Sequence, residues 1–423
     1  MNTIQTAERA VGEKAILVGL RADIFKPEEN ATEQSLDELE ALLETAGGTC
    51  AAKVLQNRHA PDPHSFIGEG KAAEVAELVK NHEASMAIFD NELSPSQIRA
   101  LEELTGAAVL DRSALILDIF AQRAQTREGR LQVELAQYQY LLPKLSGMGK
   151  SLSRLGGGIG TRGPGETKLE TDRRHIRERI TRLEAELKEV RKVRAVQRER
   201  RIKNAVPVVA LVGYTNAGKS SLLNRLTDAG IPANNRLFDT LDTTTRRLRV
   251  SDTQEALLSD TVGFIAKLPH NLIEAFQATL EELRYADLLV HVIDAASPER
   301  EAHIEVVNRL IAQLAGEGVP VIECYNKADL VGPDEIPRGE NRVAVSAKAG
   351  TGMADLLAAI AKNLDRGMRR AVFLLPYDMA GQVDTLHSQA KVLGVEYLPE
   401  GIRIEAVADE TLCGRLKKYL LET

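Results

Sequence analysis

The fold of this 423-residue chain is decided by the stretch Gly213-Tyr214-Thr215-Asn216-Ala217-Gly218-Lys219-Ser220. A continuous apolar run at residues 207–212 precedes it, as expected for a parallel strand that is buried on both faces. The spacing matches GxxxxGK[ST], in which glycines let consecutive backbone N–H groups face phosphates at the start of a helix. The sequence therefore predicts a strand, a phosphate-binding loop and a helix in succession.

Three side chains of this loop have predicted roles. Lys219 is expected to bridge the outer phosphates as a point charge, and the Ser220 hydroxyl to ligate Mg²⁺. Asn216 supports a further hypothesis, that it helps to hold K⁺ beside the phosphates, where the cation would supply the charge that other enzymes take from an arginine finger.

Two later segments select the base. Asn326-Lys327-Ala328-Asp329 follows an apolar run, and its Asp329 carboxylate can accept hydrogen bonds from the guanine N1–H and 2-amino groups, which adenine lacks. Ser346-Ala347-Lys348 follows a strand-like segment and is expected to present a backbone N–H to the guanine O6. These segments predict GTP and GDP as substrate and product.

Two switch segments are expected between the phosphate loop and the base loops. Asp260-Thr261-Val262-Gly263 fits the DxxG pattern, in which Asp260 holds Mg²⁺ through water and the Gly263 N–H senses the γ-phosphate. The earlier segment reads Phe238-Asp239-Thr240-Leu241-Asp242-Thr243-Thr244-Thr245-Arg246. We favour Thr240 as the threonine that binds Mg²⁺ with GTP, and Thr243, Thr244 and Thr245 stay as alternatives. Lys219, Thr240 and Gly263 are the predicted catalytic residues.

Phe264 stands directly after DxxG, where many GTPases carry a glutamine that orients the attacking water. A phenyl ring has no group that can position water or take its proton. The sequence therefore predicts a GTPase that hydrolyses slowly alone and is stimulated by a partner.

The remaining sequence predicts an α/β protein of four parts. Apolar runs at 15–20, 86–89 and 107–110 alternate with helical stretches at 36–45 and 71–79. A last segment alternates strand-like stretches at 372–375 and 402–407 with helix-like stretches at 381–393 and 412–421. The expected domains are an N-terminal α/β unit (1–125), an antiparallel helical hairpin (126–204), a GTPase domain with a mostly parallel sheet and helices on both faces (205–366), and a small C-terminal α+β unit (367–423).

The hairpin is predicted from two apolar seams with 4-3-4-3 spacing. The seam residues are Leu131, Leu135, Tyr138, Leu142 and Leu145 in one helix and Ile176, Ile180, Leu183, Leu187 and Val190 in the other. From Lys168 to Lys203 there are fourteen Lys/Arg against seven Asp/Glu. Two interpretations stay open: a solvated helix face, or a basic edge that lies along rRNA phosphates, with Lys150, Arg154 and Arg162 near a glycine-rich tip.

Composition limits the classes of function. The net charge is −7 and the pI is about 5.8, so any nucleic-acid contact must be local, and we expect no DNA partner. The three cysteines are scattered without metal-binding spacing, which indicates a reducing compartment. No run of about eighteen apolar residues occurs. We expect a cytoplasmic protein whose membrane association is at most peripheral, and a monomer, because the hairpin satisfies its own seam.

The assembled residues resemble the HflX GTPases, relatives of the Obg group among translation-factor-like GTPases. The resemblance rests on the phosphate loop, on Asp260-Thr261-Val262-Gly263-Phe264 and on Gly156-Gly157-Gly158-Ile159-Gly160-Thr161-Arg162-Gly163-Pro164-Gly165-Glu166 and the residues that follow to Arg174. It covers essentially the whole chain. Asp239-Thr240-Leu241-Asp242 matches the family's switch pattern, which supports Thr240. One departure is Asp242-Thr243-Thr244, where the family usually has Asp-Pro-Thr.

The resemblance implies binding to the 50S ribosomal subunit and its rRNA. It also implies that the N-terminal domain and the hairpin reach toward the peptidyl-transferase region, and that the GTP state splits stalled or idle 70S ribosomes. Two alternatives stay open: an RNA-remodelling factor that GTP only gates, and a GTP-dependent scaffold for a protein partner.

Overall fold

The computed structural model describes residues 12–146, 164–203, 206–227, 237–238, 244–251, 254–261, 263–267, 283–316, 318–364 and 368–421. These residues fall into two compact units. Those within 1–189, 234–242 and 262–279 form the first unit, and those within 190–233, 243–261 and 280–423 form the second. Both switch segments therefore include residues that belong to the first unit.

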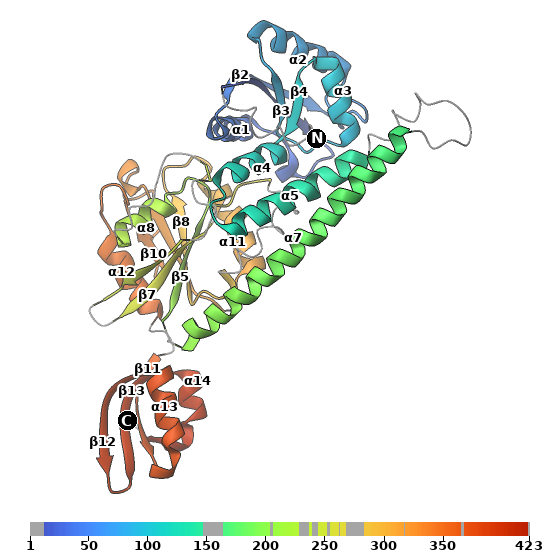
Figure 1. The fold of residues 1–423 in the computed structure, drawn as a ribbon. Helices are drawn as coiled ribbons and strands as arrows, with labels where there is room; N and C mark the ends of the chain where they lie inside the picture. The colour runs from blue at the N-terminus through green and yellow to red at the C-terminus, as the bar shows by residue number, and fades with distance from the viewer. Residues whose placement is uncertain are drawn as a thin grey trace. The chain divides into compact units, whose positions relative to one another are not determined.

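A four-stranded parallel sheet, in the order β2-β1-β3-β4, opens the first unit (Figure 1). Its core packs Val18 of β1 against Val75 of α2 and Leu101 of α3, while α1 and α4 contact each other and α1 also contacts β1. Because helices cover β1, six consecutive residues of this strand are buried. The elements are β1 (Lys14–Ala22), η1 (Pro27–Glu29), α1 (Glu33–Ala46), β2 (Thr49–Arg58), α2 (Glu69–His82), β3 (Met86–Phe89), α3 (Pro95–Thr105), β4 (Ala108–Asp111) and α4 (Arg112–Arg123).

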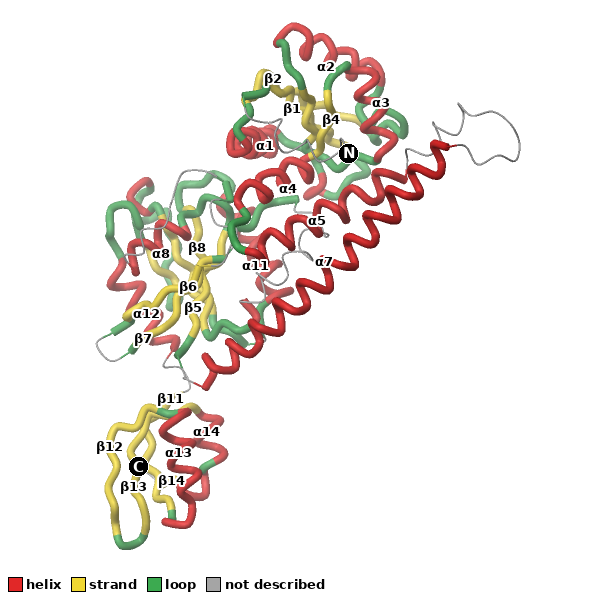
Figure 2. The backbone as a smooth tube through the Cα atoms, in the orientation of Figure 1, coloured by secondary structure: helices red, strands yellow, loops and turns green. Residues whose placement is uncertain are grey.

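Two helices, α5 (Arg127–Ser146) and α7 (Pro164–Lys203), form the predicted hairpin (Figure 2). Arg127 pairs with Glu186 at 3.8 Å and Glu134 with Arg179 at 2.7 Å, so the partners progress in opposite directions along the two helices. Four of the predicted seam residues are buried: Leu131, Leu135, Leu183 and Leu187. The other six are only partly buried. The antiparallel arrangement is thus confirmed. Lys150, Arg154, Arg162 and most of the glycine-rich tip lie outside the described residues.

The second unit contains a six-stranded sheet in the order β10-β9-β8-β5-β7-β6, parallel except for β6. Leu223 of α8 and Ile360 of α12 pack against sheet residues such as Val290, and α11 contacts β5 and β8 from the other side (Figure 1). The predicted α/β GTPase architecture is confirmed. Its elements are β5 (Val208–Gly213), α8 (Lys219–Thr227), β6 (Thr244–Arg249), β7 (Glu255–Asp260), β8 (Leu288–Asp294), α11 (Arg300–Leu314), β9 (Val321–Asn326), η2 (Ala328–Leu330), β10 (Arg342–Ala344) and α12 (Met353–Leu364).

The C-terminal segment forms an antiparallel sheet in the order β12-β13-β11-β14, with α13 and α14 on one face (Figure 2). The expected α+β character is confirmed. The helical stretches predicted at 381–393 and 412–421 are both too long. The helix α13 ends at Gln389, and β12 then pairs with β13. The helix α14 ends at Arg415, and β14 pairs with β11. The elements are β11 (Met368–Leu375), η3 (Tyr377–Met379), α13 (Ala380–Gln389), β12 (Lys391–Leu398), β13 (Gly401–Asp409), α14 (Glu410–Arg415), η4 (Lys417–Tyr419) and β14 (Leu420–Leu421).

The predicted domain boundaries at residues 125, 204 and 366 stay predictions. None of the helices in the described parts of the chain combines the length and the hydropathy that crossing a bilayer requires.

Candidate functional site

The phosphate loop joins β5 to α8, and its curve depends on two glycines. A Cβ atom on Gly213 would lie 2.2 Å from the Val292 carbonyl oxygen. Gly218 has a φ of +93°, and a Cβ atom there would lie 2.2 Å from the Asn326 amide nitrogen. Asn216 adopts a φ of 60°, a left-handed conformation that asparagine tolerates better than most residues. The loop can therefore keep this backbone only with small or permissive residues at these positions.

Lys219 is held inside the loop. Its Nζ donates hydrogen bonds to the carbonyl oxygens of Gly213 at 3.1 Å and Tyr214 at 2.8 Å. Burial lowers the pKa of Lys219 to about 8, and the negative charge of Asp260 opposes that shift. A desolvated ammonium group in this position attracts phosphate oxygens strongly.

Oxygen ligands suited to Mg²⁺ come together at the ends of β7 and the phosphate loop. Ser220 Oγ donates a hydrogen bond to Asp260 Oδ2 at 2.8 Å, and Asp260 is fully buried. A hydroxyl and a carboxylate are hard donors that fit Mg²⁺, which when bound neutralises charge that develops on the phosphates. These two residues would hold the ion.

The predicted switch ligand, Thr240, lies outside the described residues, and so do Asp239, Leu241, Asp242, Thr243 and Val262. Two of the alternatives to Thr240 are described. Thr244 and Thr245 belong to β6, where Thr245 Oγ1 lies 3.5 Å from Ser259 Oγ. Phe238 and Gly263 are described in the first unit, and both are buried.

Asn326 connects its own loop with the phosphate loop and with the Ser346-Ala347-Lys348 loop. Its side-chain amide donates to the Ala217 carbonyl oxygen at 2.8 Å, and its Oδ1 accepts from the Ala347 N–H at 3.0 Å. Asp329 is exposed, and a hydrogen bond from the Ser346 side chain lowers its pKa. The structure therefore places an ionised carboxylate beside the Ser346-Ala347-Lys348 loop, in which Lys348 is exposed.

Two predicted contact residues have structural partners within the protein. Thr261 is buried, and its hydroxyl donates to the Leu211 carbonyl oxygen at 2.7 Å, which ties β7 to β5. Lys327 has a φ of 61°, and its Nζ pairs with Asp294 Oδ2 at 2.6 Å.

Sequence reasoning missed two residues that support the site. Asp294, at the end of β8, orients Lys327, and its position directly after an apolar strand was the available signal. His303 of α11 stacks on the Tyr214 ring, with centroids 3.8 Å apart and an angle of 13° between the planes. Nothing in the sequence pattern around His303 indicates this contact.

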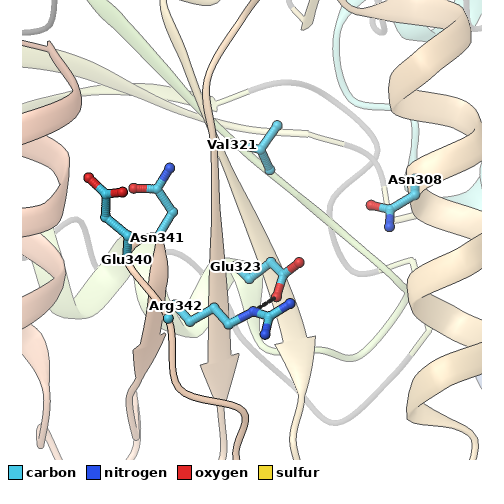
Figure 3. A pocket seen from close by; sticks show the side chains of 7 residues that line it. Asn308, Val321, Glu323, Glu340, Asn341 and Arg342 are labelled. Atoms are coloured by element: carbon cyan, nitrogen blue, oxygen red, sulfur yellow. Dashed lines mark hydrogen bonds and ion pairs between the residues drawn. The ribbon is translucent and has the colours of Figure 1, made fainter.

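A cavity of about 310 Å³ lies at the amino ends of β9 and β10, lined by Asn308, Val321, Glu323, Glu340 and Arg342 among others (Figure 3). Arg342 Nε donates to Glu323 Oε2 at 2.7 Å within it. Asn326 stands at the opposite end of β9, so this cavity is separate from the nucleotide site.

Comparison with known families matches three successive parts of the chain. Residues 33–121 match the family described as GTP-binding GTPase N-terminal. Residues 123–201 match the GTP-binding GTPase Middle Region, and residues 208–327 match the 50S ribosome-binding GTPase family.

Whole-chain relatives agree with these matches. The GTPase HflX of Caldanaerobacter subterraneus subsp. tengcongensis is 47% identical over 410 residues, covering 97% of this chain and 94% of that protein. The GTPase HflX of Escherichia coli K12 is 45% identical over 395 residues, covering 92% and 91%. Among solved structures, the crystal structure of the SsGBP and GDP complex aligns with a TM-score of 0.49 and 24% identity, over 84% of this chain and 99% of that one.

Proposed function

The chain belongs to the HflX family of GTPases, and on that premise we propose that its GTP-bound form associates with the 50S ribosomal subunit and splits stalled or idle 70S ribosomes. It binds GTP and hydrolyses it to GDP and phosphate. The proposal concerns the partner on which this activity is used.

The charge of α7 carries the proposal. The chain has a net charge of −7, whereas Lys168 to Lys203 contains fourteen basic and seven acidic residues. This helix has 40 residues and its hairpin partner α5 has 20, so α5 leaves much of α7 for other contacts. A locally basic helix on an acidic protein suits binding along rRNA phosphates, where released counterions supply the free energy.

The residue after Gly263 supports dependence on a partner. Phe264 is buried, with 2% of its surface exposed, and its ring can neither orient nor deprotonate water. Lys219 and the loop N–H groups can stabilise the charge of phosphoryl transfer, whereas the position of the attacking water is left to another group. We infer that the ribosome completes the site.

Sedimentation of 70S ribosomes tests the proposal. With a non-hydrolysable GTP analogue, the chain should convert 70S particles to subunits and remain with 50S, and with GDP it should do neither. The variant Arg174→Gln, Arg177→Gln, Arg182→Gln removes three exposed cations of α7 and should weaken 50S binding and reduce its salt slope by roughly 0.7 to 0.9 per lost phosphate contact. Arg338→Gln, on another exposed surface, is the matched control. Unchanged binding and salt slope in the triple variant would favour a protein-partner scaffold.

We also propose that Asn216 helps to hold K⁺ beside the phosphates. Its exposed side chain and left-handed backbone at the loop support this role. Hydrolysis should be several-fold faster in K⁺ than in Na⁺ buffer, and Asn216→Ala should remove the difference. Equal rates in the two buffers for the unchanged protein would refute the idea.

The remaining proposals concern location and assembly. We propose a cytoplasmic monomer that contacts rRNA and associates with membranes at most peripherally. Burial of Leu131, Leu135, Leu183 and Leu187 in the seam of α5 and α7 supports the monomer. Light scattering coupled to gel filtration should give the mass of one chain, and a dimer mass would contradict this.

A further inference from the structure

The carboxyl edge of the N-terminal sheet carries a buried cluster of charged side chains. Asp90 follows β3 and Arg112 begins α4, and their side chains are 0% and 2% exposed. Arg112 Nη1 donates to Asp90 Oδ1 at 2.7 Å, and Arg112 also pairs with Glu38 of α1. Ser35 Oγ donates to Asp90 Oδ2 at 2.8 Å. One carboxylate thus collects contacts from several elements.

A residue from the segment after DxxG completes this cluster. Lys267 pairs with Asp90 Oδ2, its side chain is only 14% exposed, and the two residues are 177 positions apart in the sequence. Burial lowers the pKa of Lys267, and the Asp90 charge opposes that shift. With Lys267 present, two cations face two carboxylates, so the charges of these four groups balance.

The backbone of Lys267 indicates that this placement is enforced. Its φ is 56°, in the left-handed region that residues with a long side chain rarely adopt. Such a conformation persists where surrounding contacts determine it. The ion pair with Asp90 is one contact that can hold Lys267 in this conformation.

The earlier switch segment is held in the same unit by different contacts. The ring of Phe238 meets Phe120 of α4 edge to face, with centroids 4.7 Å apart. The Leu237 N–H donates to Thr45 Oγ1 of α1 at 3.3 Å. Leu237 and Phe238 are therefore anchored on α1 and α4, and Lys267 on Asp90 after β3.

We propose that Lys267 is a positioning residue for GTP hydrolysis, which acts through its ion pair with Asp90 by fixing the segment that begins at Gly263. The Gly263 N–H is the donor that the sequence predicts for the γ-phosphate, and the ion pair fixes the segment that carries it. A donor fixed in advance needs no reorganisation during the reaction, so hydrolysis gains from the tether. This inference rests on the GTPase activity and on the predicted role of Gly263, and not on ribosome binding.

Single-turnover hydrolysis by the full chain without ribosomes tests the inference. Lys267→Met keeps the apolar stem and removes the charge. It should lower the rate of the chemical step by about 10- to 100-fold, the order expected for a misplaced catalytic group, with the Kd for GTP changed less than about twofold. Lys267→Arg should restore most of the rate because guanidinium also pairs with a carboxylate. Lys362→Met, which removes an exposed lysine of α12 paired with Glu340, is the matched control.

A second variant changes a hydrogen-bond partner of Asp90 and leaves Lys267 in place. Ser35→Ala removes one hydrogen bond from Asp90 without touching the switch segment, and should slow the chemical step by about two- to fivefold at unchanged Kd. A rate equal to or above that of the unchanged protein in folded Lys267→Met would overturn the proposal, and so would failure of Lys267→Arg to recover any rate. If Lys267→Met does not fold, an unchanged rate in Ser35→Ala would overturn it instead.

Discussion

The two parallel sheets of this protein use their carboxyl edges in opposite ways. In the GTPase sheet, Gly213 and Gly218 carry no side chain, so the backbone N–H groups of the loop and the buried Lys219 can bind phosphates. In the N-terminal sheet, Asp90 follows β3 and Asp111 ends the neighbouring β4, and cations of the same chain pair with both carboxylates. Polar groups gather at the carboxyl edge of a parallel sheet in both cases. Whether such an edge binds a ligand or its own chain depends on whether those groups already have partners.

We call the carboxyl edge of the N-terminal sheet the filled edge, because its carboxylates already have partners within the protein. Asp111 shows this in detail. Its Oδ1 accepts from the Tyr140 hydroxyl at 2.6 Å and from the Ala114 N–H at 3.0 Å, and its Oδ2 pairs with Lys144 at 3.0 Å. Burial raises the pKa of Tyr140, so its hydroxyl stays protonated and donates. This carboxylate caps α4 and fastens α5 to the sheet, and it has little capacity left for a ligand.

We call the carboxyl edge of the GTPase sheet the open edge, because a ligand supplies the partners of its polar groups. The largest change in free energy is expected there. Asp329→Asn exchanges an acceptor of two guanine hydrogen bonds for a mixed donor and acceptor, and should weaken GTP binding by about 10² to 10⁴-fold, the worth of two charged hydrogen bonds. Titration with a fluorescent GTP analogue measures this. Inosine triphosphate lacks the 2-amino group, so its binding should fall less. An equal loss for both nucleotides would mean that Asp329 does not contact the base edge.

At the filled edge, the cost should appear in folding and not in ligand binding. Arg112→Met leaves the buried Asp90 and the partly buried Glu38 beside a single cation, and should lower the free energy of unfolding by about 3 to 5 kcal/mol. Urea denaturation monitored by circular dichroism measures the change. GTP affinity of the folded variant should stay the same. A loss below about 1 kcal/mol would show that the carboxylates find water or other partners.

GTP binding at the open edge should also depend on pH. Lys219 has a pKa of about 8 in the free site, and bound phosphate favours its charged form. GTP affinity should therefore be complete below pH 8 and fall by up to about tenfold per pH unit as the pH rises through 8. Calorimetric titration between about pH 7 and pH 9 measures this. A flat profile would contradict a phosphate contact by Lys219.

The smallest effect is expected where a filled carboxylate loses one of several partners. Tyr140→Phe removes one hydrogen bond to Asp111 and leaves Lys144 and the Ala114 N–H in place, so the free energy of unfolding should fall by about 1 kcal/mol. Thermal unfolding of the variant beside the unchanged protein measures this. Tyr377→Phe, which removes a hydrogen bond on an exposed surface, is the control and should change stability less. Equal losses of stability in the two variants would show that the hydrogen bond to Asp111 stabilises the fold no more than an exposed one.

The sequence predicted the open edge better than the filled edge, for a physical reason. The phosphate loop is local: strand, glycines, lysine and serine follow one another, and each has a distinct chemical requirement. Lys267 and Asp90 are 177 positions apart. The sequence around an isolated lysine or aspartate does not indicate which residue it will pair with. Only the folded chain brings them together.

Secondary structure follows the same division. The buried strands β1, β3 and β5 were predicted because continuous apolar runs mark them. The strand β2 was missed since most of its residues are only partly buried. The start of β12 was predicted as the end of a helix, whereas it pairs with β13. The predicted helix seams succeeded where periodicity was long, in α5 and α7.

GTP turnover by the full chain with and without purified 50S subunits tests the central claim most directly. With Phe264 in place of a water-orienting side chain, we expect slow turnover alone and an acceleration on the order of tenfold or more with 50S subunits. Purified 30S subunits should have no such effect. Turnover that is unchanged by 50S subunits, or raised equally by 30S subunits, would contradict the claim that this GTPase depends on the large ribosomal subunit.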